Sequence, residues 1–123
     1  MKVQQSAEDY FETIYILKKR NGSVRAIDIV NEMGFSKPTV SVAMKKFREN
    51  GFITVDADGQ IELTKQGLFI AEKTYDKHNT IARILMDLGV NEKTAYEDSC
   101  RIEHCISDES FDAIKKYVAE KKG

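Results

Sequence analysis

Three residues within one short stretch carry a thiol, a carboxylate and an imidazole, which are side chains that bind transition metals. They are Cys100, Glu103 and His104. Side chains three and four positions apart are neighbours on a helix, so a helix over this stretch would place all three on one side. Soft sulfur, borderline nitrogen and hard oxygen together are the ligand types of a transition-metal ion. The stretch therefore predicts part of a metal site, with coordination positions left for residues elsewhere in the chain.

The same stretch also has ordinary explanations. A helical cysteine often packs as a small buried hydrophobic residue, and a charged run such as Arg101–His104 often forms a solvated helix face. Isolated short motifs also carry a high risk of false matches. The choice between these explanations and a metal site depends on the elements that would bring further ligands to it.

The composition is typical of a soluble globular protein with a heavily charged surface. The chain has 123 residues, of which 41% are hydrophobic and 32% charged, and its formal net charge is -1. Such a length predicts one or two small units that share a limited core. We find no apolar run near the roughly 18 residues of a membrane span and no apolar leader, so we expect no membrane partner and a cytoplasmic location. Cys100 and Cys105, five apart on a helix, suit a reducing compartment better than a disulfide.

A first helix is expected over residues 7–19, where apolar side chains recur at helical spacing. Its Asp9 and Glu12 lie three positions apart, so both carboxylates share one face. Ser6 is the expected N-cap, and Asp9 three residues later fits a capping box. Capping for Asp9 and a surface charge for Glu12 are therefore the ordinary explanations, beside a role in binding.

Two further helices fit a helix-turn-helix, the motif that places its second helix in the major groove of DNA. The first spans residues 25–33, and the second runs from the N-cap Ser36 to about Glu49, with Gly34 in the turn between them. The segment from Ser36 to Arg48 holds four cations and no acid, as phosphate binding requires. The side chains expected at DNA are short or cationic: Ser36, Lys37, Pro38, Thr39, Ser41, Val42, Lys45 and Lys46. The alternative is an ordinary amphipathic helix with a basic solvent face.

The residues after the second of these helices predict a β-hairpin. Residues 52–55 and 60–63 alternate apolar and polar side chains around an Asp-Gly turn. A hairpin in this place is the wing of a winged helix-turn-helix. Its acidic tip predicts limited contact with phosphates.

Three more helices are expected in the rest of the chain. A long one spans residues 65–88, and its apolar stripe includes the position of His78. A helix of this length also suits a dimer interface. Residues 91–105 form the next helix, and Ser107 caps the last. A histidine on an apolar stripe is usually a hydrogen-bonded core residue, so His78 has an ordinary explanation as well.

Four runs of residues, taken in order and with their spacing, resemble a known family. They are Ser6–Tyr15, Ser36–Ser41, Leu63–Gly67 and Cys100–Glu109. The chain resembles the metal-dependent repressors of the diphtheria-toxin-repressor and manganese-transport-regulator type, in the short form without a C-terminal SH3-like domain. The expected fold is mainly α: an N-terminal winged helix-turn-helix domain, residues 1–71, and an all-helical dimerisation and metal-binding domain, residues 72–123.

The resemblance implies a set of metal ligands. The first helix of the family contributes the position of Asp9, and manganese-type members add a carboxylate at that of Glu12. The long helix contributes a histidine, and the fifth helix contributes a Cys or Glu, a Glu and a His. The expected ligands are Asp9, Glu12, His78, Cys100, Glu103 and His104. Iron-type members hold an ancillary site with a carboxylate and a histidine where this chain has Ala82 and Tyr96, so that second site is not expected in its iron-type form.

The ligand types leave the identity of the metal open. A thiolate from Cys100 favours Fe(II), Zn(II) or Co(II) over Mn(II), whereas Asp9 and Glu12 favour Mn(II). We expect Fe(II) or Mn(II), with Zn(II) and Co(II) as surrogates. Cys100 must lose its proton to bind, so metal binding is expected to weaken as pH falls.

The resemblance also implies a function. The chain is expected to be a homodimeric repressor of metal-uptake genes, in iron or manganese homeostasis. It would bind a double-stranded DNA operator, and a divalent metal would be the corepressor that fixes the dimer in a DNA-competent pose. No small organic substrate is expected.

Two other functions fit parts of the sequence. One is a thiol-based, redox-sensing winged-helix regulator that uses Cys100 and Cys105, which would bind DNA in metal-free, reduced buffer and lose that binding with peroxide. The other is a small metal-dependent hydrolase. The sequence holds no His-Glu-x-x-His, nucleophile elbow or phosphate loop, so an enzyme is not expected.

Overall fold

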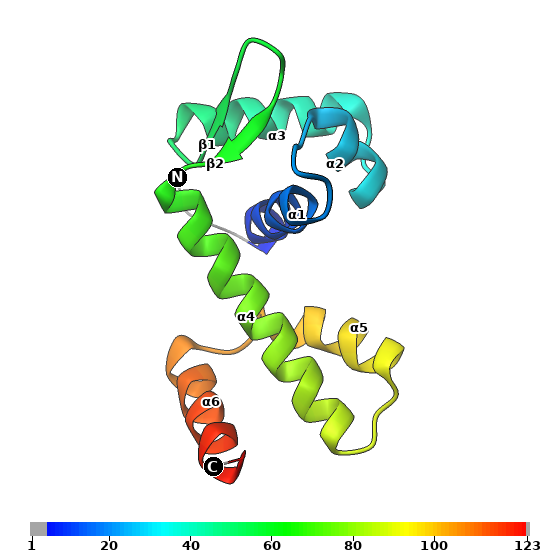
Figure 1. The fold of residues 1–123 in the computed structure, drawn as a ribbon, viewed down its shortest axis with the longest axis vertical. Helices are drawn as coiled ribbons and strands as arrows, with labels where there is room; N and C mark the ends of the chain where they lie inside the picture. The colour runs from blue at the N-terminus through cyan, green and yellow to red at the C-terminus, as the bar shows by residue number, and fades with distance from the viewer. Residues whose placement is uncertain (1–4, 123) are drawn as a thin grey trace. The chain divides into compact units, whose positions relative to one another are not determined.

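A computed structural model describes residues 5–122, and within them it holds six α-helices and one two-stranded antiparallel sheet (Figure 1). The elements are α1 (Gln5–Asn21), α2 (Ala26–Met33), α3 (Lys37–Glu49), β1 (Ile53–Val55), β2 (Ile61–Leu63), α4 (Lys65–Asp87), α5 (Glu92–Ile102) and α6 (Asp108–Lys122). The chain divides within α4 into two compact units, residues 1–73 and 74–123. The predicted mainly α fold, with a winged helix-turn-helix followed by a helical unit, is confirmed. The predicted domain boundary after residue 71 stays a prediction.

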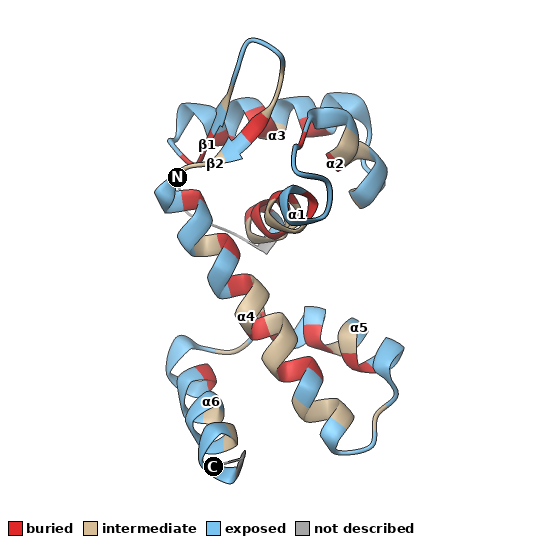
Figure 2. Cartoon of the chain, in the orientation of Figure 1, coloured by how far each residue is buried: buried red, intermediate tan, exposed pale blue. Residues whose placement is uncertain are grey.

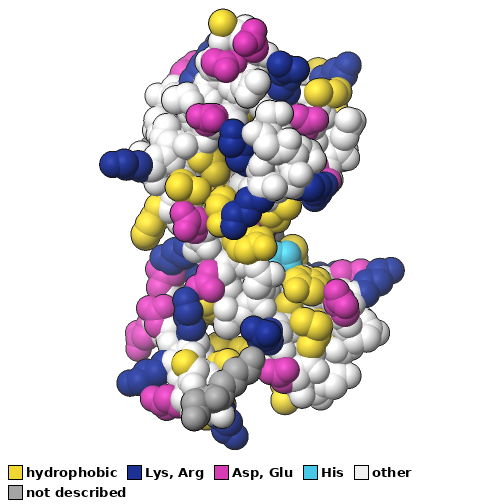
Figure 3. All heavy atoms as spheres, in the orientation of Figure 1, with side chains coloured by type: hydrophobic (Ala, Val, Ile, Leu, Met, Phe, Trp, Pro, Cys, Tyr) yellow, Lys and Arg dark blue, Asp and Glu magenta, His cyan; other side chains and the backbone are white. Residues whose placement is uncertain are grey.

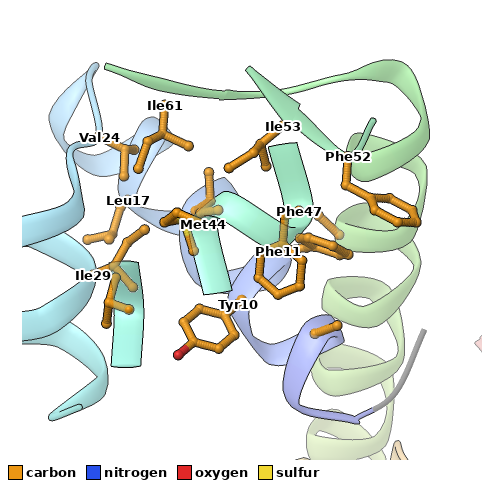
Figure 4. Close-up of a cluster of buried hydrophobic side chains, with 14 residues drawn as sticks. Tyr10, Phe11, Leu17, Val24, Ile29, Met44, Phe47, Phe52, Ile53 and Ile61 are labelled. Carbon is orange, nitrogen blue, oxygen red and sulfur yellow. The ribbon is translucent and has the colours of Figure 1, made fainter. Parts of the chain in front are cut away.

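The core of the first unit is formed by apolar side chains from α1, α2, α3 and the hairpin (Figure 4). At its centre Phe11 is fully buried, and its ring centroid lies 4.8 Å from that of Phe47 and 5.2 Å from that of Phe52. Full burial of such a side chain contributes about 1.5–3 kcal/mol. The apolar stripe of α1 thereby sets the rotation of this helix, and with it the direction of Asp9 and Glu12.

Helix α1 begins earlier than the sequence predicts. It already includes Gln5 and Ser6, whereas the sequence predicts a helix from residue 7 with Ser6 as its N-cap. Ser6 therefore lies inside the helix, and the capping box expected with Asp9 is wrong. Capping does not account for the carboxylate at this position.

Helices α2 and α3 form the predicted helix-turn-helix. α2 is closed by Gly34, whose φ of 73° lies in the left-handed region that glycine tolerates, and the Gly34 N–H donates to the Val30 carbonyl at 2.9 Å. Ser36 caps α3 as predicted, because its hydroxyl oxygen accepts the Thr39 N–H at 3.3 Å. Pro38 lies in the first turn, where a missing N–H costs nothing. The apolar positions of α3 face the core, which leaves its opposite face exposed.

The predicted hairpin follows α3, and its short strands pair with Thr54 opposite Glu62. In its turn, one carboxylate oxygen of Asp56 accepts the N–H groups of Asp58 and Gln60, both at 2.9 Å. Acidic side chains gather at the hairpin tip, which lies at the top of Figure 3. The tip therefore carries the wrong charge for close contact with phosphates.

A close approach fixes the start of α4 to the segment before β1. The Thr64 N–H donates to the Phe52 carbonyl at 3.0 Å, and the Thr64 hydroxyl donates to the Gly51 carbonyl at 2.7 Å. In the first turn of α4, a Cβ built on Gly67 would lie 2.2 Å from the Phe52 oxygen. Only glycine fits this position, a requirement that the sequence pattern does not show.

The second unit consists of the remainder of α4 together with α5 and α6. Its buried residues lie on all three helices (Figure 2): Thr74, Lys77, Ile81, Ala82, Ala95, Ser99, Glu103 and Phe111. Two ion pairs connect α4 with α6, because Lys77 Nζ lies 3.0 Å from Asp108 Oδ1 and Lys115 Nζ lies 2.5 Å from Asp76 Oδ2. None of the helices in residues 5–122 is long and apolar enough to cross a membrane.

Helix α5 is shorter than predicted. It ends at Ile102, with Glu103 as C-cap, and the Cys105 N–H donates to the Ile102 carbonyl at 2.9 Å in the following turn. The sequence predicts a helix up to residue 105, so its last turn is wrong. The next helix supplies the physical reason: Ser107 caps α6 by accepting the Ser110 N–H at 3.1 Å, so the chain has to leave the α5 helix before Ser107.

Candidate metal centre and DNA-binding surface

Three side chains that suit a metal ion meet in the second unit. His78 comes from α4, Cys100 from α5 and Glu103 from the C-cap of α5. One ligand atom from each lies within 4.8 Å of the other two. Cys100 Sγ lies 3.7 Å from His78 Nε2, and Glu103 Oε2 lies 4.0 Å from His78 Nδ1. A sulfur, a nitrogen and an oxygen ligand are therefore brought together from two helices.

His104 extends this cluster. Its Nε2 lies 3.3 Å from Glu103 Oε1, so the carboxylate has an imidazole near each of its oxygens. Both side chains are buried, with 1% of Glu103 and 4% of His104 exposed. The helix predicted over Cys100, Glu103 and His104 ends before His104. This residue follows the end of α5, and the turn after the helix places its ring beside the carboxylate.

The donor set fits a divalent transition-metal ion. Zinc-type ions bind thiolate at about 2.3 Å and imidazole at about 2.0 Å, so sulfur and nitrogen on one ion can lie up to about 4.3 Å apart. The 3.7 Å between Cys100 Sγ and His78 Nε2 is within that reach. A buried carboxylate can be ionised only with compensating charge nearby, and a metal cation at Glu103 would supply it.

Two residues beside this cluster, which the sequence does not predict as ligands, contact His78 directly. Ser99 on α5 is fully buried, and its hydroxyl donates to the main-chain carbonyl of His78 on α4. The Tyr96 ring meets the His78 ring edge to face, with centroids 5.5 Å apart and planes at 73°. The only sequence signal for them is their helical spacing from Cys100, one and four positions away.

The two expected ligands of the first unit lie on α1. Asp9 is half-buried, and Glu12 is buried with 6% of the residue exposed. The burial contradicts the ordinary explanation of Glu12 as a surface charge, because ionised carboxylates are rarely buried unless they are paired. That Asp9 and Glu12 bind the same metal as His78 and Cys100 stays a prediction.

The exposed face of α3 carries the residues expected at DNA. All eight are exposed: Ser36, Lys37, Pro38, Thr39, Ser41, Val42, Lys45 and Lys46. Val42 is 70% exposed, so this face combines cations with an apolar side chain that an ordinary solvated helix would not require. Lys45 Nζ has only a long approach of 4.0 Å to Glu49 Oε1, which leaves it available for another anion.

A crevice beside α3 adds residues to this surface. It has a volume of about 360 Å³, and its lining includes Ser41, Lys45 and Arg48 from α3 and Gly59 from the hairpin turn. The two cations and the Ser41 hydroxyl suit an anionic group such as a phosphate, beside the apolar side chains of Met44, Val55 and Ile61. The sequence could not place Gly59 here, because only the packing of β1 on α3 brings the turn to this helix.

Both parts of the chain match one protein family. Residues 2–60 match the family described as "Iron dependent repressor, N-terminal DNA binding domain", and residues 64–122 match "Iron dependent repressor, metal binding and dimerisation domain". The chain belongs to the iron-dependent repressor family. The resemblance predicted from the sequence is confirmed, and with it a homodimeric, metal-dependent, DNA-binding transcriptional repressor that uses a divalent metal. In this iron-dependent repressor, α3 lies in the DNA-binding match, and the His78 cluster lies in the metal-binding match.

Individual relatives of this repressor agree with the assignment. An uncharacterized HTH-type transcriptional regulator of Methanocaldococcus jannaschii is 34% identical over 98% of this chain and 98% of its own length. The transcriptional regulator MntR of Escherichia coli is 30% identical over 90% of this chain and 72% of its own length. The solved manganese regulator SloR is similar with a TM-score of 0.79 at 29% identity, over 97% of this chain and 55% of the SloR chain. The repressor therefore spans about half the length of that solved chain.

Proposed function

We propose that the corepressor metal of this protein is held by six side chains: His78, Cys100, Glu103, His104, Asp9 and Glu12. The observation that carries the proposal is the approach of ligand atoms from His78, Cys100 and Glu103 to within 4.8 Å of one another. His104 joins them through its 3.3 Å approach to the Glu103 carboxylate. Asp9 and Glu12 are supported by the family resemblance and by the burial of Glu12.

The ligand types decide which ions suit the site. Cys100 offers a thiolate, which favours Fe(II), Zn(II) and Co(II), whereas the carboxylates favour harder ions such as Mn(II). We infer that the physiological ion is Fe(II) or Mn(II), with Zn(II) and Co(II) as surrogates.

The proposed mechanism is electrostatic. The carboxylates of Asp9, Glu12 and Glu103 would hold the divalent ion, and its positive charge would offset their mutual repulsion. Cys100 as a thiolate and His78 as a neutral imidazole provide ligands on helices of the metal-binding and dimerisation part. Ligands from α1 therefore link metal binding to the DNA-binding part. This coupling is reciprocal, so operator DNA should tighten metal binding by the same factor.

The proposed DNA-binding element is α3. In a dimer, the two recognition helices enter successive major grooves when they lie about 34 Å apart or a multiple of that distance. Lys45 and Lys46 would contact phosphates, which position the protein, and Val42 suits apolar contact with a thymine methyl group. The crevice at Lys45 and Arg48 on α3 would take a further backbone phosphate. We infer that the operators control metal-uptake genes, that the protein acts in the cytoplasm, and that it catalyses no reaction.

Cys100→Ala tests the ligand assignment, with Cys105→Ala as the matched control, because both thiols are exposed and lie five residues apart. The duplex is selected from a random-sequence pool by the parent protein with Mn(II). Fluorescence anisotropy then measures DNA affinity anaerobically, at fixed salt, with Fe(II), Mn(II), Zn(II) or chelator. We expect metal to strengthen DNA binding of the parent and of Cys105→Ala but not of Cys100→Ala.

The outcome that contradicts the assignment is a Cys100→Ala variant that responds to metal as the parent does. The thiol-redox alternative predicts a different pattern in the same assay. It requires DNA binding in chelator and reductant, and loss of that binding with peroxide in the parent but not in either cysteine variant.

Glu12→Gln tests the contribution of α1. The matched control is Glu8→Gln, which removes a partly buried carboxylate one turn away on the same helix. We expect Glu12→Gln to weaken Mn(II) binding, measured by calorimetry on the metal-free chain, because a hard ligand is lost. Equal Mn(II) affinities of Glu12→Gln, Glu8→Gln and the parent would remove Glu12 from the site.

A further inference from the structure

One face of α5 meets His78 through four side chains at helical spacing. They are Tyr96, Ser99, Cys100 and Glu103. Successive members are three, one and three positions apart, so all four lie on the same side of the helix. Cys100 and Glu103 are proposed ligands. Tyr96 and Ser99 are not ligands in that proposal, yet both contact the histidine directly.

The contact from Ser99 fixes the backbone of His78. Ser99 has no exposed surface, and its hydroxyl donates to the His78 main-chain carbonyl. A buried hydroxyl that lost its acceptor would carry an uncompensated desolvation penalty, so the two helices are held together at this point. The position of the His78 Cα relative to Cys100 is thereby set, but the orientation of the imidazole is not.

The imidazole orientation depends on contacts, because rotation of a histidine ring about its last torsion has only broad, roughly two-fold preferences. Tyr96 provides such a contact: the two rings meet edge to face, with centroids 5.5 Å apart. In that orientation, Nε2 faces Cys100 Sγ at 3.7 Å, and Nδ1 faces Glu103 Oε2 at 4.0 Å. An imidazole binds one ion through a single nitrogen, and Nε2 is the nitrogen that faces the Cys100 sulfur.

We propose that Tyr96 is a positioning residue for metal binding, whose ring holds the His78 imidazole with Nε2 toward Cys100. The inference rests on the proposed function, since it takes His78 and Cys100 as ligands. A ligand held in its binding orientation loses less conformational freedom when the metal binds, so the affinity is higher. Partners that orient metal-binding histidines commonly have this effect.

Two substitutions test whether the effect of Tyr96 comes from its aromatic ring, from its hydroxyl group or from apolar bulk alone. Tyr96→Phe keeps the ring and removes the hydroxyl, whereas Tyr96→Leu keeps an apolar side chain without a flat ring. We expect Tyr96→Phe to bind Co(II) within about twofold of the parent, and Tyr96→Leu to raise the Kd for Co(II) roughly threefold to tenfold, the range that an edge-to-face ring pair supports.

The measurement is an anaerobic Co(II) titration of the metal-free full chain, followed through thiolate-to-cobalt charge-transfer absorption. This absorption reports whether Cys100 binds the ion, which a general loss of stability would not change at saturation. In a His78→Ala background, Tyr96→Leu should cause no additional loss, because its effect passes through the imidazole. If Tyr96→Leu lowers the helical circular dichroism, Tyr96→Met, an unbranched helix former, replaces it with the same expectation.

Three results would overturn the inference. Co(II) affinity of the ring-free variant equal to that of the parent would show that the ring does not position His78. An equal loss in the His78→Ala background would show that Tyr96 acts through packing of α5 alone. If the parent itself shows no thiolate absorption with Co(II), the ligand assignment fails as well, and this failure is distinct from the first two.

Discussion

Gly67→Ala should destabilise the first unit, although alanine is the better helix former. A Cβ at this position would lie 2.2 Å from the Phe52 carbonyl oxygen and 3.1 Å from Leu63 Cδ2. The first contact is with backbone, which cannot rotate away as a side chain can. The first turn of α4 would have to move by about 1 Å to restore an ordinary contact distance.

The cost of that movement follows from the contacts it disturbs. The Phe52 carbonyl accepts the Thr64 N–H at 3.0 Å, and the Thr64 hydroxyl donates to the Gly51 carbonyl at 2.7 Å. Overpacking costs about 1–3 kcal/mol, weakening two hydrogen bonds costs about 1–3 kcal/mol, and the helix propensity of alanine offsets about 1 kcal/mol. The expected net destabilisation is about 3 kcal/mol, which lowers Tm by about 12–24 °C for a unit of this size.

Thermal unfolding of the full chain, followed by circular dichroism, measures this effect. Gln66→Ala is the matched control, since Gln66 is the exposed neighbour in the same helical turn. We expect the control to stay within about 2 °C of the parent, because surface substitutions change stability little. A Gly67→Ala variant with raised Tm would refute the reasoning, since that is the result for a helical glycine with free space around it.

Two further predictions concern α3. Ser36→Ala should cost about 1 kcal/mol of stability in urea unfolding, because the Thr39 N–H loses its capping acceptor, and an unchanged midpoint would contradict that role. Lys45→Ala should weaken binding to all duplex sequences alike and reduce the slope of log affinity against log salt by about 1. Lys73→Ala, on α4, is the control, because it also removes one positive charge. If the two variants give the same slope of log affinity against log salt, Lys45 does not contact DNA.

The helix-turn-helix could be predicted because its signals are local. Ser36 and Pro38 start α3, Gly34 permits the left-handed turn before it, and each acts through its own backbone geometry or cap. The predicted start of α1 was wrong because its signal is also local. Ser6 is a good capping residue by type, but the helix extends past it, and a local signal does not show which of several starts is used.

The metal cluster could be predicted only in part. The approach of Cys100 and Glu103 was correct, because Glu103 is the C-cap of α5 and keeps a helical backbone conformation, three positions after Cys100. His104 lies beside Glu103, but on the turn after α5 and not on the predicted helix, because the helix ends at Ile102. Ser99 and Tyr96 could not be assigned, because their roles depend on which residue of α4 lies opposite them.

Residue types and their periodicity alone determined the helices, the hairpin, the exposed basic face of α3 and the chemistry of each metal-binding side chain. These properties depend on backbone preferences and on neighbours within a few positions. Tertiary structure decided that His78 faces Cys100 at 3.7 Å, that Gly67 must lack a side chain, and that the Gly59 turn lies beside Arg48. Such contacts join segments far apart in the chain, and packing of the buried side chains sets them.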